Sequence, residues 1–342
     1  MKKLSKWVIL LALAVVLTAC GSSDEATGED SVSNEGAEGE SYDLKMSITV
    51  GNNTSWYEGA QKLADDVKEA SDGRINITVY TNEQLAGGDS AGTVEQLMNG
   101  LIDMSYNSTI IYSIMDERFG VLSAPFLFTD LEATDEALAG AGGEAINEIL
   151  RENNVEPLGF GQNGFRQISN SQHPIQTPAD LENMKVRIPG ISMYTDLFRE
   201  LGADPTTMTF SEVFTSLQQG TIDAQENPID VFHSAQLAEV QDYITLWNYS
   251  YDPIVLGINK DLFESMSAED QEILRTAAVE ANALQIQVAR EREADQIAEL
   301  QEQGVEFYEP TEDELELFRQ AVEPVYEKYE SVWGADLLNS FR

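Results

Sequence analysis

The chain has 342 residues, enough for roughly two or three domains, and carries 60 acidic against 20 basic residues, a net charge of −40. This acidity argues against nucleic acid or an anionic membrane face as a binding partner. With one cysteine and two histidines, an intrachain disulfide is excluded, and the sequence predicts neither a metal site nor another cofactor.

The N-terminus has the pattern of a secretory signal. Lysines precede an apolar run over residues 7–17, which is too short to span a membrane. The sequence Leu17-Thr18-Ala19-Cys20 resembles a bacterial lipobox, which implies that residues 1–19 are removed and that Cys20 is lipidated. Residues 20–42 are small, acidic and without apolar periodicity, so we expect a flexible tether between a membrane anchor and a folded domain.

Strands and helices alternate from residue 44 onward. The pattern predicts strands at 44–50 and 75–80, with a helix over 56–67 between them, and then a helix followed by a strand within 94–107. The fold class is therefore α/β.

The middle of the chain predicts further elements of both kinds. The apolar stretch 119–128 is expected to be a loop packed into the core. Thr129 opens a capping box for a helical region that runs to about residue 153, and strands are predicted at 155–162 and 164–170.

The C-terminal part predicts strands at 243–250 and 254–259, followed by one long helix over 267–303. A last helical segment begins with a capping box at Thr311, and a break is expected near Pro324.

Two segments share one plan, which suggests an internal repeat. Residues 184–228 predict strand, helix, strand, helix and strand, with a capping box at 209–212. Within this run FTSLQQGTIDAQEN (214–227) matches VEQLMNGLIDMSYN (94–107) at five positions. We expect two similar lobes, each a βαβαβ half with helices over a largely parallel sheet.

Three polar residues at predicted strand ends are candidates for a binding site. Arg166 and Arg187 lie in strand-like segments, and a guanidinium there can hold a carboxylate with two parallel hydrogen bonds; a structural ion pair between lobes is the alternative. Asn227 precedes Pro228 and suits either a polar ligand or a turn that caps the next helix.

Catalytic chemistry has no candidate in the sequence. Residues 159–164 match G-x-G-x-x-G, but a strand-like segment follows where a dinucleotide site requires a helix, so we reject the match. We identify no nucleophile with an adjacent base, and no enzyme activity is predicted.

Several short motifs, in order, resemble the extracytoplasmic solute receptors (DctP-type) of TRAP transporters. The resemblance covers about residues 44–304. The matching stretches are Asp72-Gly73-Arg74-Ile75, Ala124-Pro125-Phe126-Leu127-Phe128, Asn163-Gly164-Phe165-Arg166, Lys185-Val186-Arg187-Ile188-Pro189, Phe210-Ser211-Glu212-Val213, Leu217-Gln218-Gln219-Gly220 and Gln225-Glu226-Asn227-Pro228.

This resemblance implies a two-lobe periplasmic-binding-protein-like fold with hinge strands and a long helix that spans both lobes. Lobe I is expected at residues 43–163 plus about 253–292, and lobe II at 164–252 plus about 293–342.

The resemblance also implies roles for individual residues. Arg187 would form the salt bridge to a ligand carboxylate. The other expected ligand-binding positions are Arg166, Asn227 and Phe210 in lobe II, and Asn52, Asn53, Asn107 and Ser108 in lobe I, with Gln162 and Tyr249 added to the site.

The implied function is a receptor, anchored by lipid to the outer face of the cell membrane, that binds a small organic acid and delivers it to the permease subunits of a TRAP transporter. The receptor of an ABC importer is the main alternative. A surface hydrolase and a purely structural lipoprotein are weaker alternatives.

Overall fold

The computed structural model describes residues 39–342 of the chain. The predicted signal peptide, Cys20 and nearly all of the predicted tether lie outside these residues. No helix within 39–342 combines the length and the apolar character needed to cross a membrane.

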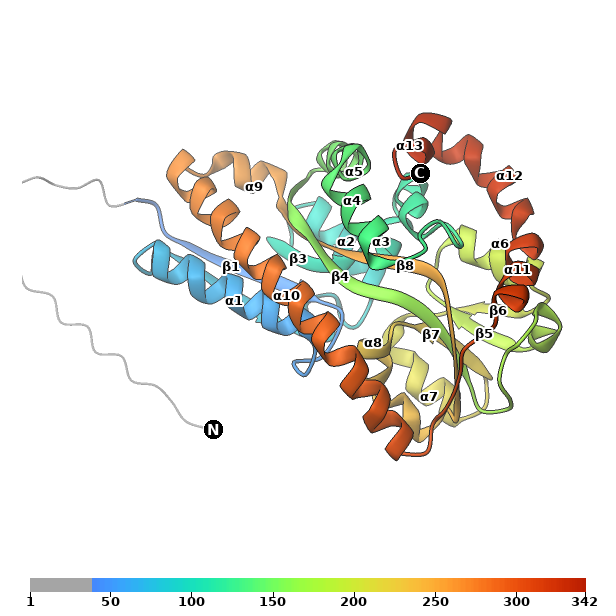
Figure 1. Ribbon diagram of the computed structural model, residues 1–342. Coiled ribbons are helices and arrows are strands. Elements are labelled where there is room, and N and C mark those ends of the chain that lie inside the picture. Colours follow the sequence, from blue (N-terminus) through green and yellow to red (C-terminus); the bar gives the residue numbers. More distant parts are fainter. Residues whose placement is uncertain (1–38) are drawn as a thin grey trace, which may run out of the picture. The chain divides into compact units, whose positions relative to one another are not determined.

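One mixed sheet with helices around it organises the described chain (Figure 1), which agrees with the predicted α/β class. Its strand order is β2-β1-β3-β8-β4-β7-β5-β6, with β9 beside β8. The strands are β1 (Tyr42–Ile48), β2 (Ile75–Tyr80), β3 (Met104–Ser108), β4 (Val155–Asn170), β5 (Lys185–Ile188), β6 (Asp204–Thr207), β7 (Ala224–Asn227), β8 (Tyr243–Asn259) and β9 (Glu306–Tyr308).

The sheet has two corresponding halves. In the first half, β1 pairs in parallel with β2 and β3; in the second half, β5 pairs in parallel with β6 and β7. The long antiparallel strands β4 and β8 lie between the halves and connect them. The structure therefore contains the two parallel βαβαβ units that the sequence predicts, joined by antiparallel strands.

Several helices begin close to the positions that the sequence predicts, whereas two short helices, over residues 109–112 and 260–265, were not predicted. The helices are α1 (Ser55–Ala70), α2 (Ser90–Met98), α3 (Thr109–Tyr112), α4 (Leu131–Ala139), α5 (Ala141–Glu152), α6 (Ser192–Glu200), α7 (Val213–Gln218), α8 (Ile229–Ser234), α9 (Lys260–Ser265), α10 (Ala268–Glu302), α11 (Glu312–Ala321), α12 (Glu323–Trp333) and α13 (Ala335–Asn339).

The long helix α10 contacts elements from both halves of the molecule. Its 35 residues correspond to about 50 Å of helix, and it packs against α1, β4 and α8 (Figure 1). Ser267 caps its start, because the side chain accepts a hydrogen bond from the backbone of Asp270. The predicted long helix is confirmed.

Two predicted capping boxes are wrong. The N-cap of α4 is Asp130 rather than Thr129, and the helical region breaks at Gly140 into α4 and α5. Thr209 makes no cap hydrogen bond; its hydroxyl instead donates to the carbonyl of Gly88 in the other half of the molecule. The box at Thr311 is confirmed, as is the helix break next to Pro324.

The predicted strand pairs around residues 163 and 252 are single continuous strands. In β4 the pairing register shifts between Gln162 and Gly164, a bulge at which Gly164 has φ 111°. A bulge bends a strand without ending it, so the sequence pattern is interrupted while the strand is not.

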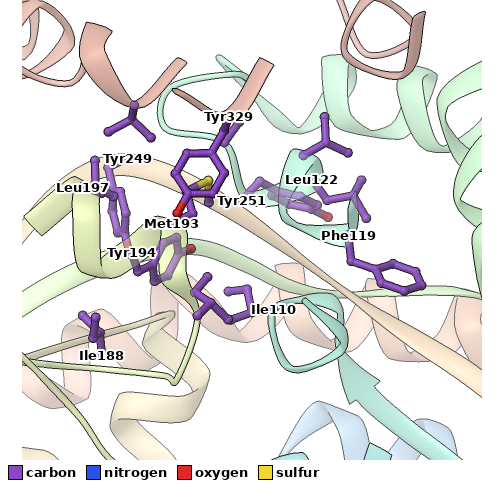
Figure 2. Packing of buried hydrophobic residues seen from close by; sticks show 14 of the residues in the cluster. Ile110, Phe119, Leu122, Ile188, Met193, Tyr194, Leu197, Tyr249, Tyr251 and Tyr329 are labelled. Carbon is purple, nitrogen blue, oxygen red and sulfur yellow. The ribbon is translucent and has the colours of Figure 1, made fainter. Parts of the chain in front are cut away.

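The apolar segment 119–128 packs into the core as predicted, with Phe119 and Leu122 buried (Figure 2). Nearby, the rings of Tyr194 on α6 and Tyr249 on β8 lie 5.7 Å apart (Figure 2). These contacts fix the central strands against the second half of the sheet.

Candidate ligand-binding site

A cavity between the two halves contains about 410 Å³ of space between protein atoms, part of which is open to solvent. Its position follows from the topology, because the parallel strands of both halves end here and polar groups at carboxyl ends of strands converge. The lining residues are Thr49, Val50, Trp56, Ser90, Ser108, Ile110, Ile111, Asn163, Arg166, Arg187, Pro189, Phe210, Asn227, Val231 and Asp252. This mixture of an apolar wall and a few polar groups is typical of small-molecule sites.

Arg187 is a buried cation that lines this cavity. It lies on β5 and is only 3% exposed, yet it makes no salt bridge within the described chain. Its Nε and Nη2 donate to the carbonyl of Met208 at 3.1 and 2.8 Å, and its guanidinium lies 5.9 Å from the centre of the Phe210 ring. Burial lowers its pKa to about 10, which still leaves the side chain charged at neutral pH.

Arg166 is equally buried but fully paired. Its guanidinium forms salt bridges with Glu226 and, at 2.8 Å, with Asp252, and Nη2 also donates to Asn227 at 3.0 Å. Burial alone would lower the pKa of Arg166, but the charge of Glu226 outweighs this and keeps the pKa well above its usual value. The charge of Arg166 is therefore paired with two of the protein's own carboxylates.

The first half contributes hydroxyl groups. Thr49 follows β1, Ser90 begins α2, and Ser108 ends β3. The hydroxyls of Thr49 and Ser90 both contact the buried carboxyl of Glu83, at 2.9 and 2.8 Å. Sequence reasoning identified Ser108 but missed the other two hydroxyls, since isolated Thr and Ser residues in loops give no distinctive signal.

Half of the predicted site residues line the cavity. The structure brings Arg187, Arg166, Asn227, Phe210 and Ser108 together there. It also places Trp56, Asn163 and Asp252 in the lining, which the sequence analysis did not single out.

The other five predicted residues do not line the cavity. Asn52 and Asn53 are exposed, and Asn53 donates to the carbonyl of Ser234 at 3.3 Å. Their positions give no support to direct ligand contact.

Asn107, Gln162 and Tyr249 are buried behind the lining, where they hold other residues. Asn107 Oδ1 accepts from Thr49, Gln162 Oε1 accepts from Arg290, and the Tyr249 hydroxyl donates to Glu226. These oxygens are thus engaged inside the protein, whereas the amide nitrogen of Asn107 is buried without a partner among the described residues.

Residues 39–342 contain no group of three or more His, Cys, Asp or Glu side chains able to hold a metal ion.

Comparison with known proteins agrees with the geometry. The model of the family described as bacterial extracellular solute-binding protein, family 7 (DctP), matches residues 46–332. Among curated proteins, a solute-binding protein of Roseobacter denitrificans is 33% identical over 267 residues, which cover 78% of this chain and 81% of that protein. The C4-dicarboxylate-binding protein DctB of Bacillus subtilis is 30% identical over 296 residues, covering 86% and 84% of the two chains.

A solved structure shows the same architecture. A TRAP periplasmic solute-binding protein of Ralstonia eutropha, crystallised with bound (S)-2-acetolactate, superimposes with a TM-score of 0.85 at 36% identity. The match covers 87% of this chain and 97% of that one, so the two-lobe fold of these receptors is shared. The chain belongs to the DctP family of bacterial extracellular solute-binding proteins.

Proposed function

We propose that this protein is the extracytoplasmic receptor of a TRAP transporter and that it holds a small organic acid by its carboxylate at Arg187. The ligands of the relatives support the class. The Ralstonia protein binds acetolactate and the Bacillus protein is named for C4-dicarboxylates, so both ligands carry a carboxylate. The family is one of substrate-binding proteins, and we propose no catalytic role.

The observation that carries the proposal is the buried, unpaired charge of Arg187. A buried charge is costly unless an opposite charge and hydrogen bonds compensate it. In the described chain the only hydrogen bonds of this guanidinium go to one neutral carbonyl, although it faces a cavity. A ligand carboxylate would supply the missing charge, and the planar guanidinium can bind it through two N–H groups.

We further propose that the two lobes close on the ligand, with lobe I at residues 43–163 plus about 253–292 and lobe II at 164–252 plus about 293–342. Two buried clusters support this division, since one lies around β1 and α1 and the other around α7 and α8, while a third and larger cluster joins the lobes at the central strands. The carbonyl of Gly88 accepts hydrogen bonds from Thr209 at 2.8 Å and from Ser211 at 3.1 Å, which ties the lobes together at the cavity mouth.

The proposed location is the outer face of the cell membrane, with a lipid on Cys20. The lipobox-like sequence before this cysteine supports the assignment. In cells fed a labelled fatty acid, the wild-type protein should carry the label and sediment with membranes. The Cys20→Ala variant should lack the label and appear in the soluble fraction; a labelled variant would contradict the assignment.

The test of ligand binding compares two arginines of the same lobe. Arg187→Ala should weaken binding of an organic acid by about 100-fold or more, because two charge-assisted hydrogen bonds are lost. Arg199, which is exposed on α6, provides the matched control, and Arg199→Ala should bind normally. A thermal-shift screen of organic acids identifies a ligand and calorimetry then measures affinity; equal affinity of both variants would overturn the proposal.

A further inference from the structure

The part of the cavity wall formed by Thr49 and Ser90 in the first half, called the acceptor wall, presents hydrogen-bond acceptors to the cavity. The same half also lines the cavity with Trp56, whose indole N–H is buried without a partner among the described residues. The hydroxyl of Ser90 donates to Oε2 of Glu83 at 2.8 Å, so its single proton points away from the cavity. The hydroxyl of Thr49 lies 2.9 Å from Oε1 of Glu83 and 2.7 Å from Oδ1 of Asn107, and its proton serves one of these two oxygens. Both hydroxyls are left with only lone pairs for a ligand.

Two further groups continue this acceptor wall. The Ser108 hydroxyl donates its proton to Asp252 at 2.5 Å. The amide nitrogen of Asn163 donates to the same carboxylate at 2.6 Å, which leaves Oδ1 of Asn163 buried at the cavity without a partner among the described residues. A ligand that satisfies these oxygens must bring O–H or N–H groups.

Glu83 is the residue that sets the direction of the two first-half hydroxyls. It is 2% exposed and lies between β2 and α2 with φ 52°, a backbone conformation that is rare for a side chain of this type. The charged groups that face it are Asp89 at the start of α2 and Arg187 across the cavity. Glu83 also borders a second hollow, and no other residue that lines this hollow is ionisable. These other residues are Thr49, Asn82, Phe210, Ser211, Val213, Phe214, Ala235 and Leu237.

We propose that Glu83 is a specificity-determining positioning residue that turns the Thr49 and Ser90 hydroxyls into acceptors, so that the receptor selects a monocarboxylate bearing hydroxyl groups over a dicarboxylate. The inference rests on the proposed function of Arg187. One end of the ligand, its carboxylate, meets the guanidinium, and its hydroxyls donate to the acceptor wall. A second carboxylate has no proton to donate and would face oxygen lone pairs.

The acceptor character persists when Glu83 is protonated. Burial raises the pKa of Glu83 to about 7, so both forms occur near neutral pH. A proton on Oε1 can be donated to Thr49, which then donates to Asn107, whose Oδ1 orientation is fixed by a hydrogen bond from the Ser108 backbone. Protonation on Oε1 therefore removes the negative charge but does not turn either hydroxyl toward the cavity.

The experiment compares two acids of the same chain length, D-erythronate and succinate. In calorimetry the wild-type protein should bind D-erythronate at least about tenfold more tightly, and this ratio should rise between about pH 6.5 and about pH 8.5 as Glu83 ionises. Glu83→Leu removes both acceptor oxygens and frees the Ser90 proton, so the ratio should fall by about tenfold at both pH values.

Glu83→Gln is the matched control variant. Its amide can receive the Ser90 proton and donate to Thr49, so the preference should remain but lose its dependence on pH. A wild-type preference for succinate, or an unchanged ratio in Glu83→Leu, would overturn the inference. If other organic acids bind but neither probe does, the inference fails while the proposed function stands; if no organic acid binds, the proposed function itself fails.

Discussion

The two halves of the sheet share a backbone plan but differ in the chemistry at their strand ends. The sequence of exposed and buried positions over residues 101–110 recurs at 221–230. Asp103 accepts a hydrogen bond from the backbone of Lys45 at 2.8 Å, and Asp223 does the same for Lys185 at 2.9 Å. The predicted repeat is therefore also a repeat of specific contacts.

The difference lies in the groups that reach the cavity. The second half presents the unpaired cation Arg187, whereas the first half presents hydroxyls backed by Glu83. A duplicated scaffold thus contributes a cation from one half and hydroxyl acceptors from the other half to the same cavity. The two halves are therefore distinguished by the polarity of the side chains that they present to the cavity rather than by the shape of their backbone.

The largest expected effect concerns the two buried arginines. Arg166→Leu should lower the free energy of unfolding by about 3–5 kcal/mol, because Glu226 and Asp252 lose their cation. Arg187→Leu should not destabilise the unliganded protein, since it removes a charge with no ionic partner. Denaturant unfolding measures both variants, and similar losses in the two would contradict the distinction drawn between them.

The next largest expected effect is the pH dependence that Glu83 gives to the free energy of unfolding. A pKa raised from 4.5 to about 7 means that the folded state keeps a proton that the unfolded state has lost. The stability contribution of this group is therefore fully present below pH 4.5 and is lost as the pH rises to about 7, by about 3 kcal/mol. Relative to the wild type, Glu83→Gln should gain that amount over this window in urea unfolding; a difference that does not change with pH would contradict the assignment.

The smallest expected effect tests the equivalence of the halves. Asp103→Ala and Asp223→Ala each remove one acceptor for a backbone N–H, so each should cost about 1 kcal/mol of unfolding free energy. The two losses should agree within about 0.5 kcal/mol. Markedly unequal losses would show that the repeated contacts differ in their contribution to stability.

Local patterns in the sequence were sufficient for much of the fold. Features that depend on neighbouring residues can be read from the sequence. They include the ends of α10, the cap at Thr311 and the repeat around Asp103 and Asp223. The continuity of strand β4 could not be predicted from local patterns, because its bulge is defined by pairing with a distant strand.

The site was harder to predict because it depends on long-range packing. Arg166 and Arg187 look alike in the sequence and are both 3% exposed, but only the structure shows which one is paired. Glu83 is one of 60 acidic residues and has no local mark of burial. The Thr209 hydroxyl fits a helix cap locally, yet it bonds to Gly88 across the cavity mouth.

A crystal structure of the protein with a bound hydroxy acid tests the central claim most directly. We expect the ligand carboxylate at about 2.7–2.9 Å from the guanidinium nitrogens of Arg187. A ligand carboxylate bound elsewhere, with Arg187 still bonded only to the carbonyl of Met208, would contradict the account.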